Sequence, residues 1–333
     1  MEPVGLWRVI CLLAYCWQAY GKPQGSIFDA IKRNESRNVE MNSSKWSLDP
    51  QHYLQNHIIA DIHFIQKVHE LSFELQQTSQ ILNIMVIGAC DGTHDRLIYD
   101  LINPDNAHWR GILVEPLAHN FRDLTVNLRN VSHRIKTLQC AVTDQCVSEY
   151  VNMSYARVRP EVQDKYPHWF TREIASLDPN VTLLFEKFAH SPSKIKRIIK
   201  DAANGSSVDM KDFEWTTEAV KCMTGSVLIS RMPASDWIHV IKIDAEGRDF
   251  LILLTLLKFF LRYRSRGDRT GVMRLPLLIL IENKFLTNVQ RARLAAATQQ
   301  LGYESTLSYA PLGHAQHGLN ANDALFFQPH WKL

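Results

Sequence analysis

The chain contains 333 residues, enough for one large α/β domain with a peripheral segment or for two small domains, and we favour the former. Its 37 Lys and Arg residues nearly balance its 34 Asp and Glu residues, so the composition shows no electrostatic footprint for nucleic acid. We therefore expect no nucleic-acid partner, and a hydrophobic content of 46% permits a well-filled core.

The first 21 residues are predicted to be a cleaved signal peptide. An apolar segment at 9–17 precedes Ala19 and Gly21, small residues spaced as a signal-peptidase site requires. The apolar part is shorter than the ~20 residues that cross a bilayer, so we expect no stable membrane span, with a signal anchor as the alternative. Residues 22–50 are polar and aperiodic, and we interpret them as a flexible stem.

Six Asn-x-Ser/Thr sequons support passage through the secretory lumen, and all are expected outside strands: Asn34, Asn42, Asn130, Asn152, Asn180 and Asn204. The predicted localisation is therefore the secretory pathway or the extracellular space.

The predicted domain, residues 51–333, begins with an amphipathic helix over 52–77, where apolar residues recur every three or four positions. Its histidines His57, His63 and His69 are six residues apart and lie on different faces. We expect them to be solvated rather than metal ligands, and we expect no metal site.

Residues 81–93 are predicted to form a strand that ends in a Gly-rich turn at 88–92. A short helix at 95–101, a strand at 111–115, a helix that begins at Pro116 and a third strand at 135–141 follow. With right-handed crossovers, these elements make half of a parallel, doubly wound sheet.

Residues 145–235 interrupt this alternation and are too long for a simple connection. Such an insertion is either a functional cover or an irregular surface lobe, and it contains a predicted helix at 193–203.

The sheet resumes with a strand at 239–244, a buried helix at 250–261, a strand at 277–281 and a helix at 288–300. Residues 303–307 and 324–327 are predicted as a closing pair of strands. The fold class is therefore α/β, with a Rossmann-like, mostly parallel sheet.

In such a sheet, ligands bind beyond the carboxyl ends of the strands. The candidate binding residues at those ends are Gly88, Ala89, Asp91, Gly92, Glu115, Pro116, Asp144 and Asp244. Glu115 lies near the ~20-residue spacing at which an acid accepts hydrogen bonds from ribose hydroxyls, although an acid that favours a helix N-terminus is the alternative. Asp144 is predicted to meet an adenine amino group.

The sequence lacks the phosphate-binding Lys of a P-loop and the full Gly-x-Gly-x-x-Gly of dinucleotide enzymes. A ligand with an adenosine group and no phosphates fits this pattern better. S-adenosylmethionine is such a ligand, and it is the predicted cofactor.

Three ordered motifs, at 86–92 (VIGACDG), 109–116 (WRGILVEP) and 241–250 (IKIDAEGRDF), resemble those of FkbM-type S-adenosylmethionine-dependent methyltransferases. The resemblance implies a class I methyltransferase fold and methyl transfer to a hydroxyl of a sugar or small metabolite. The chain departs from the family pattern at Val86 and Cys90, where polar residues are common. This departure predicts weaker cofactor binding through the loss of a hydrogen bond.

Asp244 is the predicted general base or acceptor-positioning group, with Glu246 second, although both could instead cap the following helix. Lys242 alternates with Ile241 and Ile243, so we expect it to face the other side and pair with an acid. His94 and Asp95 are weaker candidates for acceptor contacts.

Four cysteines follow the predicted leader. Cys90 and Cys140 would lie roughly 9–10 Å apart, on strands separated by a third strand, beyond the ~7 Å limit for a disulfide. We therefore expect Cys146 to pair with either Cys140 or Cys222.

The predicted function is O-methylation of a glycan or small metabolite in the secretory pathway. The alternative is a non-catalytic binding or cargo-handling protein that keeps the fold.

Overall fold

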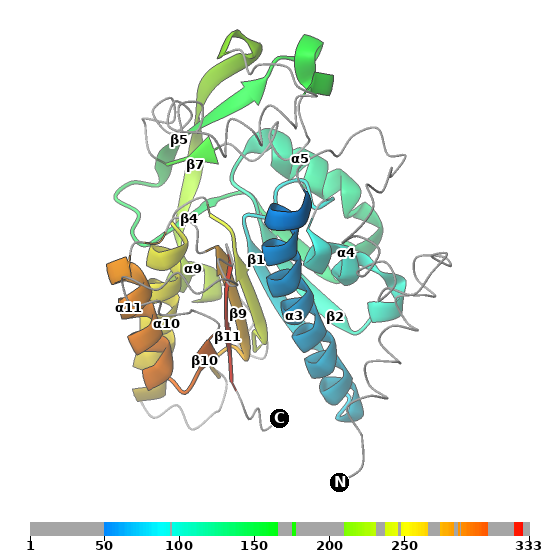
Figure 1. The fold of residues 1–333 in the computed structure, drawn as a ribbon, viewed down its shortest axis with the longest axis vertical. Coiled ribbons are helices and arrows are strands. Elements are labelled where there is room, and N and C mark those ends of the chain that lie inside the picture. The colour runs from blue at the N-terminus through cyan, green and yellow to red at the C-terminus, as the bar shows by residue number, and fades with distance from the viewer. Residues whose placement is uncertain are drawn as a thin grey trace. The chain divides into compact units, whose positions relative to one another are not determined.

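The computed structural model describes residues 50–93, 95–165, 175–177, 210–230, 237–245, 248–265, 274–282, 286, 288–305 and 323–328 (Figure 1). The predicted signal peptide, nearly all of the predicted stem, the predicted helix at 193–203, His94 and Glu246 lie outside the described residues. So do the sequons at Asn34, Asn42, Asn180 and Asn204.

A seven-stranded sheet forms the centre of the domain, in the order β10-β11-β9-β8-β1-β2-β3 (Figure 1). Its strands are β1 (Leu82–Ile87), β2 (Trp109–Val114), β3 (Ile135–Leu138), β8 (Val240–Ile243), β9 (Leu278–Glu282), β10 (Glu304–Ser305) and β11 (Asp323–Phe327). All neighbours are parallel except β11, which runs antiparallel between β9 and β10. The predicted Rossmann-like sheet with an antiparallel closing strand is confirmed.

Six α-helices of the described residues accompany the strands: α3 (Pro50–Gln77), α4 (Arg96–Ile102), α5 (Ala118–Asn127), α9 (Gly225–Ser230), α10 (Asp249–Ser265) and α11 (Asn288–Gln300). Short 3-10 helices occur at η1 (Pro104–Asn106), η2 (Arg129–Val131), η3 (Pro160–Lys165) and η4 (Met210–Asp212). None of the helices in the described part of the chain is long and apolar enough to cross a membrane.

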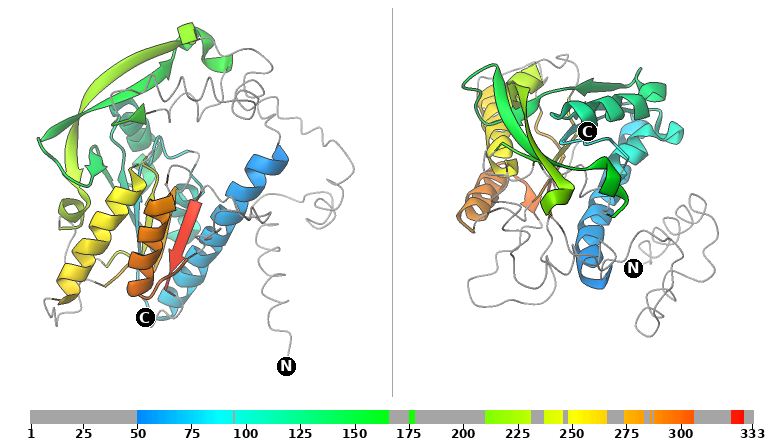
Figure 2. Two further views of the ribbon diagram at one scale, coloured as in Figure 1. Left: turned by 60° about the vertical axis from the view of Figure 1, so that its left-hand side comes forward. Right: turned by 90° about the horizontal axis from the view of Figure 1, so that it is seen from above.

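The helices cover both faces of the central sheet (Figures 1 and 2). Alternate residues of β8 belong to two apolar clusters: Ile241 and Ile243 pack with α9, α10 and α11, and Val240 packs in the cluster that contains α3, α4 and α5. Because successive strand residues point to opposite faces, a parallel strand covered on both sides reads as a continuous apolar run.

A second sheet has the order β4-β7-β5-β6 and contains β4 (Ala141–Thr143), β5 (Tyr150–Val158), β6 (Ala175–Ser176) and β7 (Phe213–Thr224). The prediction of one strand over 135–141 was therefore wrong. The last residue of β2, Val114, pairs with Leu138, so β3 has no partner beyond that point. The chain turns there, and Ala141 pairs with Cys222 of β7.

The insertion at 145–235 contains more regular structure than its sequence suggested. Strands β5 and β7 pair antiparallel over nine residue pairs and lie side by side in both figures. Asn152 lies within β5, which corrects the expectation that the sequons fall outside strands. We call these two strands the β5–β7 hairpin.

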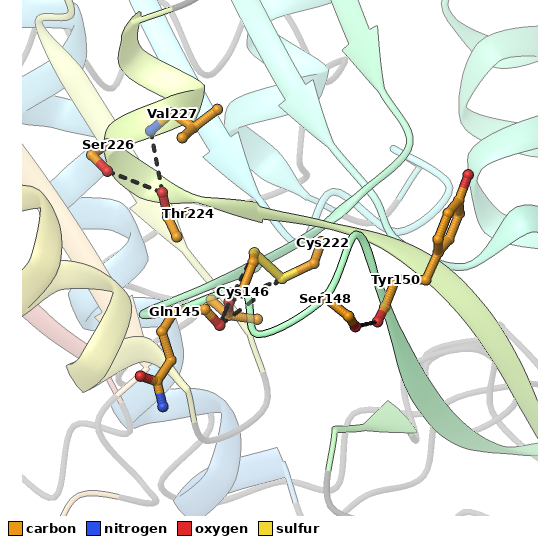
Figure 3. The surroundings of a disulfide bond; sticks show 9 residues. Gln145, Cys146, Ser148, Tyr150, Cys222, Thr224, Ser226 and Val227 are labelled. Carbon is orange, nitrogen blue, oxygen red and sulfur yellow. Dashed lines mark hydrogen bonds between the residues drawn. A yellow bond between two sulfur atoms is a disulfide. The ribbon is translucent and has the colours of Figure 1, made fainter.

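A disulfide joins Cys146, in the turn before β5, to Cys222 of β7, with a Cα–Cα distance of 5.7 Å (Figure 3). Of the two predicted partners of Cys146, Cys222 is thus the one that forms the disulfide. Cys90 and Cys140 carry thiols. The disulfide fixes the start of β5 against β7, the strand that lies between β5 and β4 in the second sheet.

Candidate functional site

A cavity opens at the carboxyl ends of β1, β2 and β8, the edge at which the sequence placed the ligand. Seven of the eight predicted binding residues line it: Gly88, Ala89, Asp91, Gly92, Glu115, Pro116 and Asp244. Asp144 is the exception, because it follows β4 in the second sheet and is not among the described lining residues. Ala141 and Val142 of β4 line the cavity in its place.

Gly88 allows the ends of β1 and β8 to approach closely. Its φ is +86°, and a Cβ at this position would lie 1.8 Å from the Asp244 carbonyl oxygen. The Asp244 N–H donates to the Ile87 carbonyl at 2.9 Å, which continues the pairing of the two strands. A side chain at residue 88 would therefore displace Asp244, the predicted catalytic residue.

The turn after β1 uses its backbone donors within the protein. The Gly88 and Ala89 N–H groups donate to the Val114 carbonyl, at 2.9 and 3.0 Å. The Cys90 N–H donates to Glu115 at 2.9 Å, and the Thr93 N–H donates to Asp91 at 3.0 Å. A phosphate cradle presents its N–H groups to the ligand, so this turn is better suited to a ligand without phosphates.

Glu115 is the central acid of the cavity. It is 4% exposed, and its two carboxylate oxygens accept hydrogen bonds from the N–H groups of Cys90 (2.9 Å) and Leu117 (3.0 Å). Burial raises the pKa of Glu115 to about 7; these hydrogen bonds oppose the rise, and nearby Asp244 adds to it. Because a carboxylate has about four acceptor positions, Glu115 can hold the turn after β1 and still accept from a ligand hydroxyl.

Lys242 donates to Asp95 at 2.7 Å, and both side chains line the cavity. The predicted pairing of Lys242 with an acid is confirmed. Asp95 is also the N-cap of α4, because its other carboxylate oxygen accepts from the N–H groups of Leu97 and Ile98. This one acid therefore fixes both the start of α4 and the ammonium group of Lys242.

The loop after β8 is held by Asp249, the first residue of α10, to which the sequence assigned no role. Its buried carboxylate accepts from the Ala245 N–H at 3.2 Å. Asp244 and Arg248, on either side of this turn, both line the cavity. The turn thus leaves Asp244 at the ligand side of the loop.

Val86 lies away from the cavity. Its side chain is fully buried in the apolar cluster with residues of α3 and α4, including Val68 and Ile98, and is not among the lining residues. A direct bond from this position to the cofactor was therefore a wrong expectation. Cys90 does line the cavity and has a φ of +49°. Its N–H bond to Glu115 does not depend on the side chain.

The sequence did not identify the residues that the second sheet contributes. Met153 of β5, Ala175 of β6 and Leu177 line the cavity. The insertion was interpreted either as a functional cover or as an irregular surface lobe. Its contribution to the cavity wall favours the first interpretation. Val151, Met153 and Tyr155 alternate with polar residues in the sequence, and this two-residue period was the available signal.

His69, which was expected to be solvated, is only partly exposed. His69 lies 3.0 Å from Asp100, and its ring centroid lies 5.2 Å from that of Trp109, so it is a structural residue between α3 and the sheet. The described residues contain no group of three or more His, Cys, Asp or Glu side chains that could hold a metal ion.

No protein-family model matches the chain, and a comparison with curated proteins finds no match. Among solved structures, the chain is similar to the N-terminal domain of human METTL16, at 11% identity and a TM-score of 0.33 over 81% of this chain and 70% of that one. A putative caffeoyl-CoA O-methyltransferase from Staphylococcus aureus matches over 95% and 96% of the two chains, at 8% identity and a TM-score of 0.32. Aeropyrum pernix fibrillarin, which has S-adenosyl-L-methionine bound, matches over 74% and 66%, at 12% identity and a TM-score of 0.28.

The assignment of the fold depends on the strand order rather than on these similarities. The order β3-β2-β1-β8-β9 is that of a doubly wound sheet. Strand β11, the last in the sequence, lies between β9 and β10 in the sheet and is antiparallel to both. The chain therefore has a doubly wound, Rossmann-like α/β fold.

Proposed function

We propose that the chain is an S-adenosylmethionine-dependent methyltransferase of FkbM type, and that it transfers a methyl group to a hydroxyl of a glycan or small metabolite in the secretory pathway. The observation that carries the proposal is the cavity itself. It lies at the carboxyl ends of β1, β2 and β8 and brings Glu115 and Asp244 together from separate strands.

The described residues fit an adenosine-containing cofactor. Glu115 would accept hydrogen bonds from the ribose hydroxyls, and Leu117, Ala141 and Val142 supply apolar surface for the adenine. The turn at Gly88 to Gly92 would bound the methionine part. When bound, the cofactor supplies an electrophilic methyl group on a sulfonium.

Asp244 has the position that an acceptor-activating group needs. It lines the cavity at the end of β8, close enough to Glu115 for its charge to raise the pKa of that carboxyl. An alcohol is a weak nucleophile while it keeps its proton. The Asp244 carboxylate would orient the acceptor hydroxyl and receive this proton.

Three features support the secretory assignment: the apolar leader sequence, the exposed sequon residues Asn130 and Asn152, and the Cys146–Cys222 disulfide. Disulfides persist mainly in oxidising compartments. Treatment with a glycosidase should lower the mass of protein expressed in secretory cells, and an unchanged mass would contradict glycosylation.

The alternative function is binding without catalysis. It is favoured by one observation: the insertion at 145–235 contributes Met153, Ala175 and Leu177 to the cavity wall. In that case the cavity would bind a ligand or partner and Asp244 would have no proton to receive.

The variant Asp244→Asn separates the two functions. We expect it to bind S-adenosylhomocysteine as the wild type does and to lose turnover, measured as S-adenosylhomocysteine release across a panel of hydroxylated glycans and metabolites. Asp144→Asn is the matched control, because Asp144 is not among the described lining residues, and it should retain both properties. Equal turnover of the two variants would remove Asp244 from the mechanism.

A further inference from the structure

The β5–β7 hairpin presents one face to the cavity and to α5. Met153 of β5 lines the cavity and is paired across the hairpin with Glu218 of β7. Tyr155 is two residues beyond Met153, and directly paired residues share a face of a sheet. The side chains of Met153, Tyr155 and Glu218 therefore lie on the same face.

Two contacts connect this face to the start of α5. The Glu218 carboxylate accepts from the Ala118 N–H, with distances of 3.2 and 3.4 Å to its two oxygens. The Tyr155 ring lies on His119, with 5.1 Å between ring centroids. The N-cap residue of α5, Leu117, makes no side-chain capping bond, so Glu218 supplies from the hairpin the acceptor that the helix itself lacks.

The same short segment holds Glu115. The Leu117 N–H donates to Glu115, and the next N–H along the chain, that of Ala118, donates to Glu218. Glu115 in turn accepts from the Cys90 N–H in the turn after β1. Hydrogen bonds on two adjacent backbone N–H groups thus connect the β5–β7 hairpin, through Leu117 and Ala118, to the turn that bounds the cavity.

We propose that Glu218 is a positioning residue for this site. By accepting a hydrogen bond from the Ala118 N–H, it holds the β5–β7 hairpin closed over the cavity, where Met153 forms part of the wall. The same hydrogen bond keeps the N-terminus of α5 in the conformation that orients Glu115. The role of this closure in cofactor binding rests on the proposed function. The closure itself does not, because it is a property of the ligand-free protein.

The test compares Glu218→Ala with Glu218→Gln, whose amide oxygen can still accept from Ala118. Glu149→Ala is the matched control, because Glu149 is an exposed acid at the base of the same hairpin that pairs with Lys221 at 3.6 Å. The first measurement is the rate at which a maleimide labels Cys90, a thiol at the cavity wall, in full-length protein with the disulfide intact.

Without ligand, Cys90 of Glu218→Ala should be labelled about fivefold faster than Cys90 of the wild type. This is the change in the equilibrium constant for opening that the loss of one helix cap produces. Glu218→Gln and Glu149→Ala should label at the wild-type rate. Equal rates for all four proteins would overturn the proposal. If Glu218→Ala does not fold, Tyr155→Ala, which removes the second contact, should show the faster labelling, and a wild-type rate there would overturn the proposal as well.

The second measurement is the affinity for S-adenosylhomocysteine, which should fall in Glu218→Ala and be restored in Glu218→Gln. A wild type that does not bind this ligand would contradict the proposed function, whereas the labelling rates would still decide the closure. Faster labelling of Glu218→Ala with unchanged affinity would overturn the link between the hairpin and Glu115.

Discussion

The two sheets of this domain are stabilised by different interactions. In the central sheet, every residue of β9 and all of β8 except Lys242 are buried between two layers of helices. In the second sheet, β5 and β7 have many exposed residues and are joined by a disulfide, with a hydrogen bond from Ala118 to Glu218 connecting them to α5. Because apolar burial stabilises the first sheet, we expect the second sheet to open locally at a lower free energy than the first.

The largest effect should come from the point where β1 meets β8. We expect Gly88→Ala to lower the free energy of unfolding by about 3 kcal/mol or more, because the added Cβ would overlap the Asp244 carbonyl. Gly302→Ala is the control: its φ is also positive, at +83°, but the nearest atom to the added Cβ is 3.8 Å away. Urea denaturation should show a loss of only about 1 kcal/mol there. Equal losses would show that the close approach does not matter.

Removal of the disulfide should affect the second sheet selectively. The double substitution of Cys146 and Cys222 by Ser should cost about 2–4 kcal/mol of local stability. It removes the covalent link between two residues that are 76 positions apart in the sequence, so the unfolded segment gains conformational entropy. Hydrogen exchange should accelerate in β5 and β7 while β1 and β8 keep their protection. Uniform acceleration across both sheets would contradict the distinction between them.

Glu115 should make the stability depend on pH. Its pKa in the folded protein, about 7, lies above its ordinary value of 4.5, so the folded state binds more protons between these values. The free energy of unfolding should therefore decrease as pH rises from 4.5 to 7 and level off above that range. Glu115→Gln should lack a component of this decrease on the order of 3 kcal/mol, measured by denaturation across the range. The same slope in both proteins would contradict the raised pKa.

The smallest effect should come from an exposed ion pair on the second sheet. Glu149→Ala removes the exposed ion pair with Lys221 and should change the free energy of unfolding by less than about 0.5 kcal/mol. A larger change would mean that surface charges contribute to this sheet more than its disulfide and its contacts with α5 suggest.

The central sheet could be predicted from the sequence because its signals are local. Apolar runs gave β1, β2, β8 and β9, and the acids at the carboxyl ends of β2 and β8 gave Glu115 and Asp244. Lys242 in the middle of a buried strand predicted its own acidic partner, which proved to be Asp95.

The errors have a common physical origin in contacts between distant parts of the chain. The strand predicted at 135–141 ends early because β2 offers no partner beyond Val114, and Ala141 instead pairs with a residue 81 positions later, Cys222. Because of this change in pairing, Asp144 follows β4 in the second sheet and is not among the described lining residues of the predicted site. His69 similarly contacts Asp100 and Trp109, which no periodicity within α3 could reveal.

Val86 illustrates a different limit. A family motif assigns a polar role to its position, but the pleat of β1 points this side chain into the apolar cluster shared with α3 and α4. The neighbouring Ile87 faces the cavity instead. Position in a motif therefore did not determine which side chain lines the cavity.

The central claim is that the cavity at the carboxyl ends of β1, β2 and β8 binds an adenosine-containing sulfonium cofactor. A calorimetric titration of the full-length protein with S-adenosylhomocysteine tests it most directly. We expect saturable binding at one site, with thermal stabilisation by the ligand and weaker binding in Glu115→Gln. No heat and no stabilisation at saturating ligand would contradict the claim.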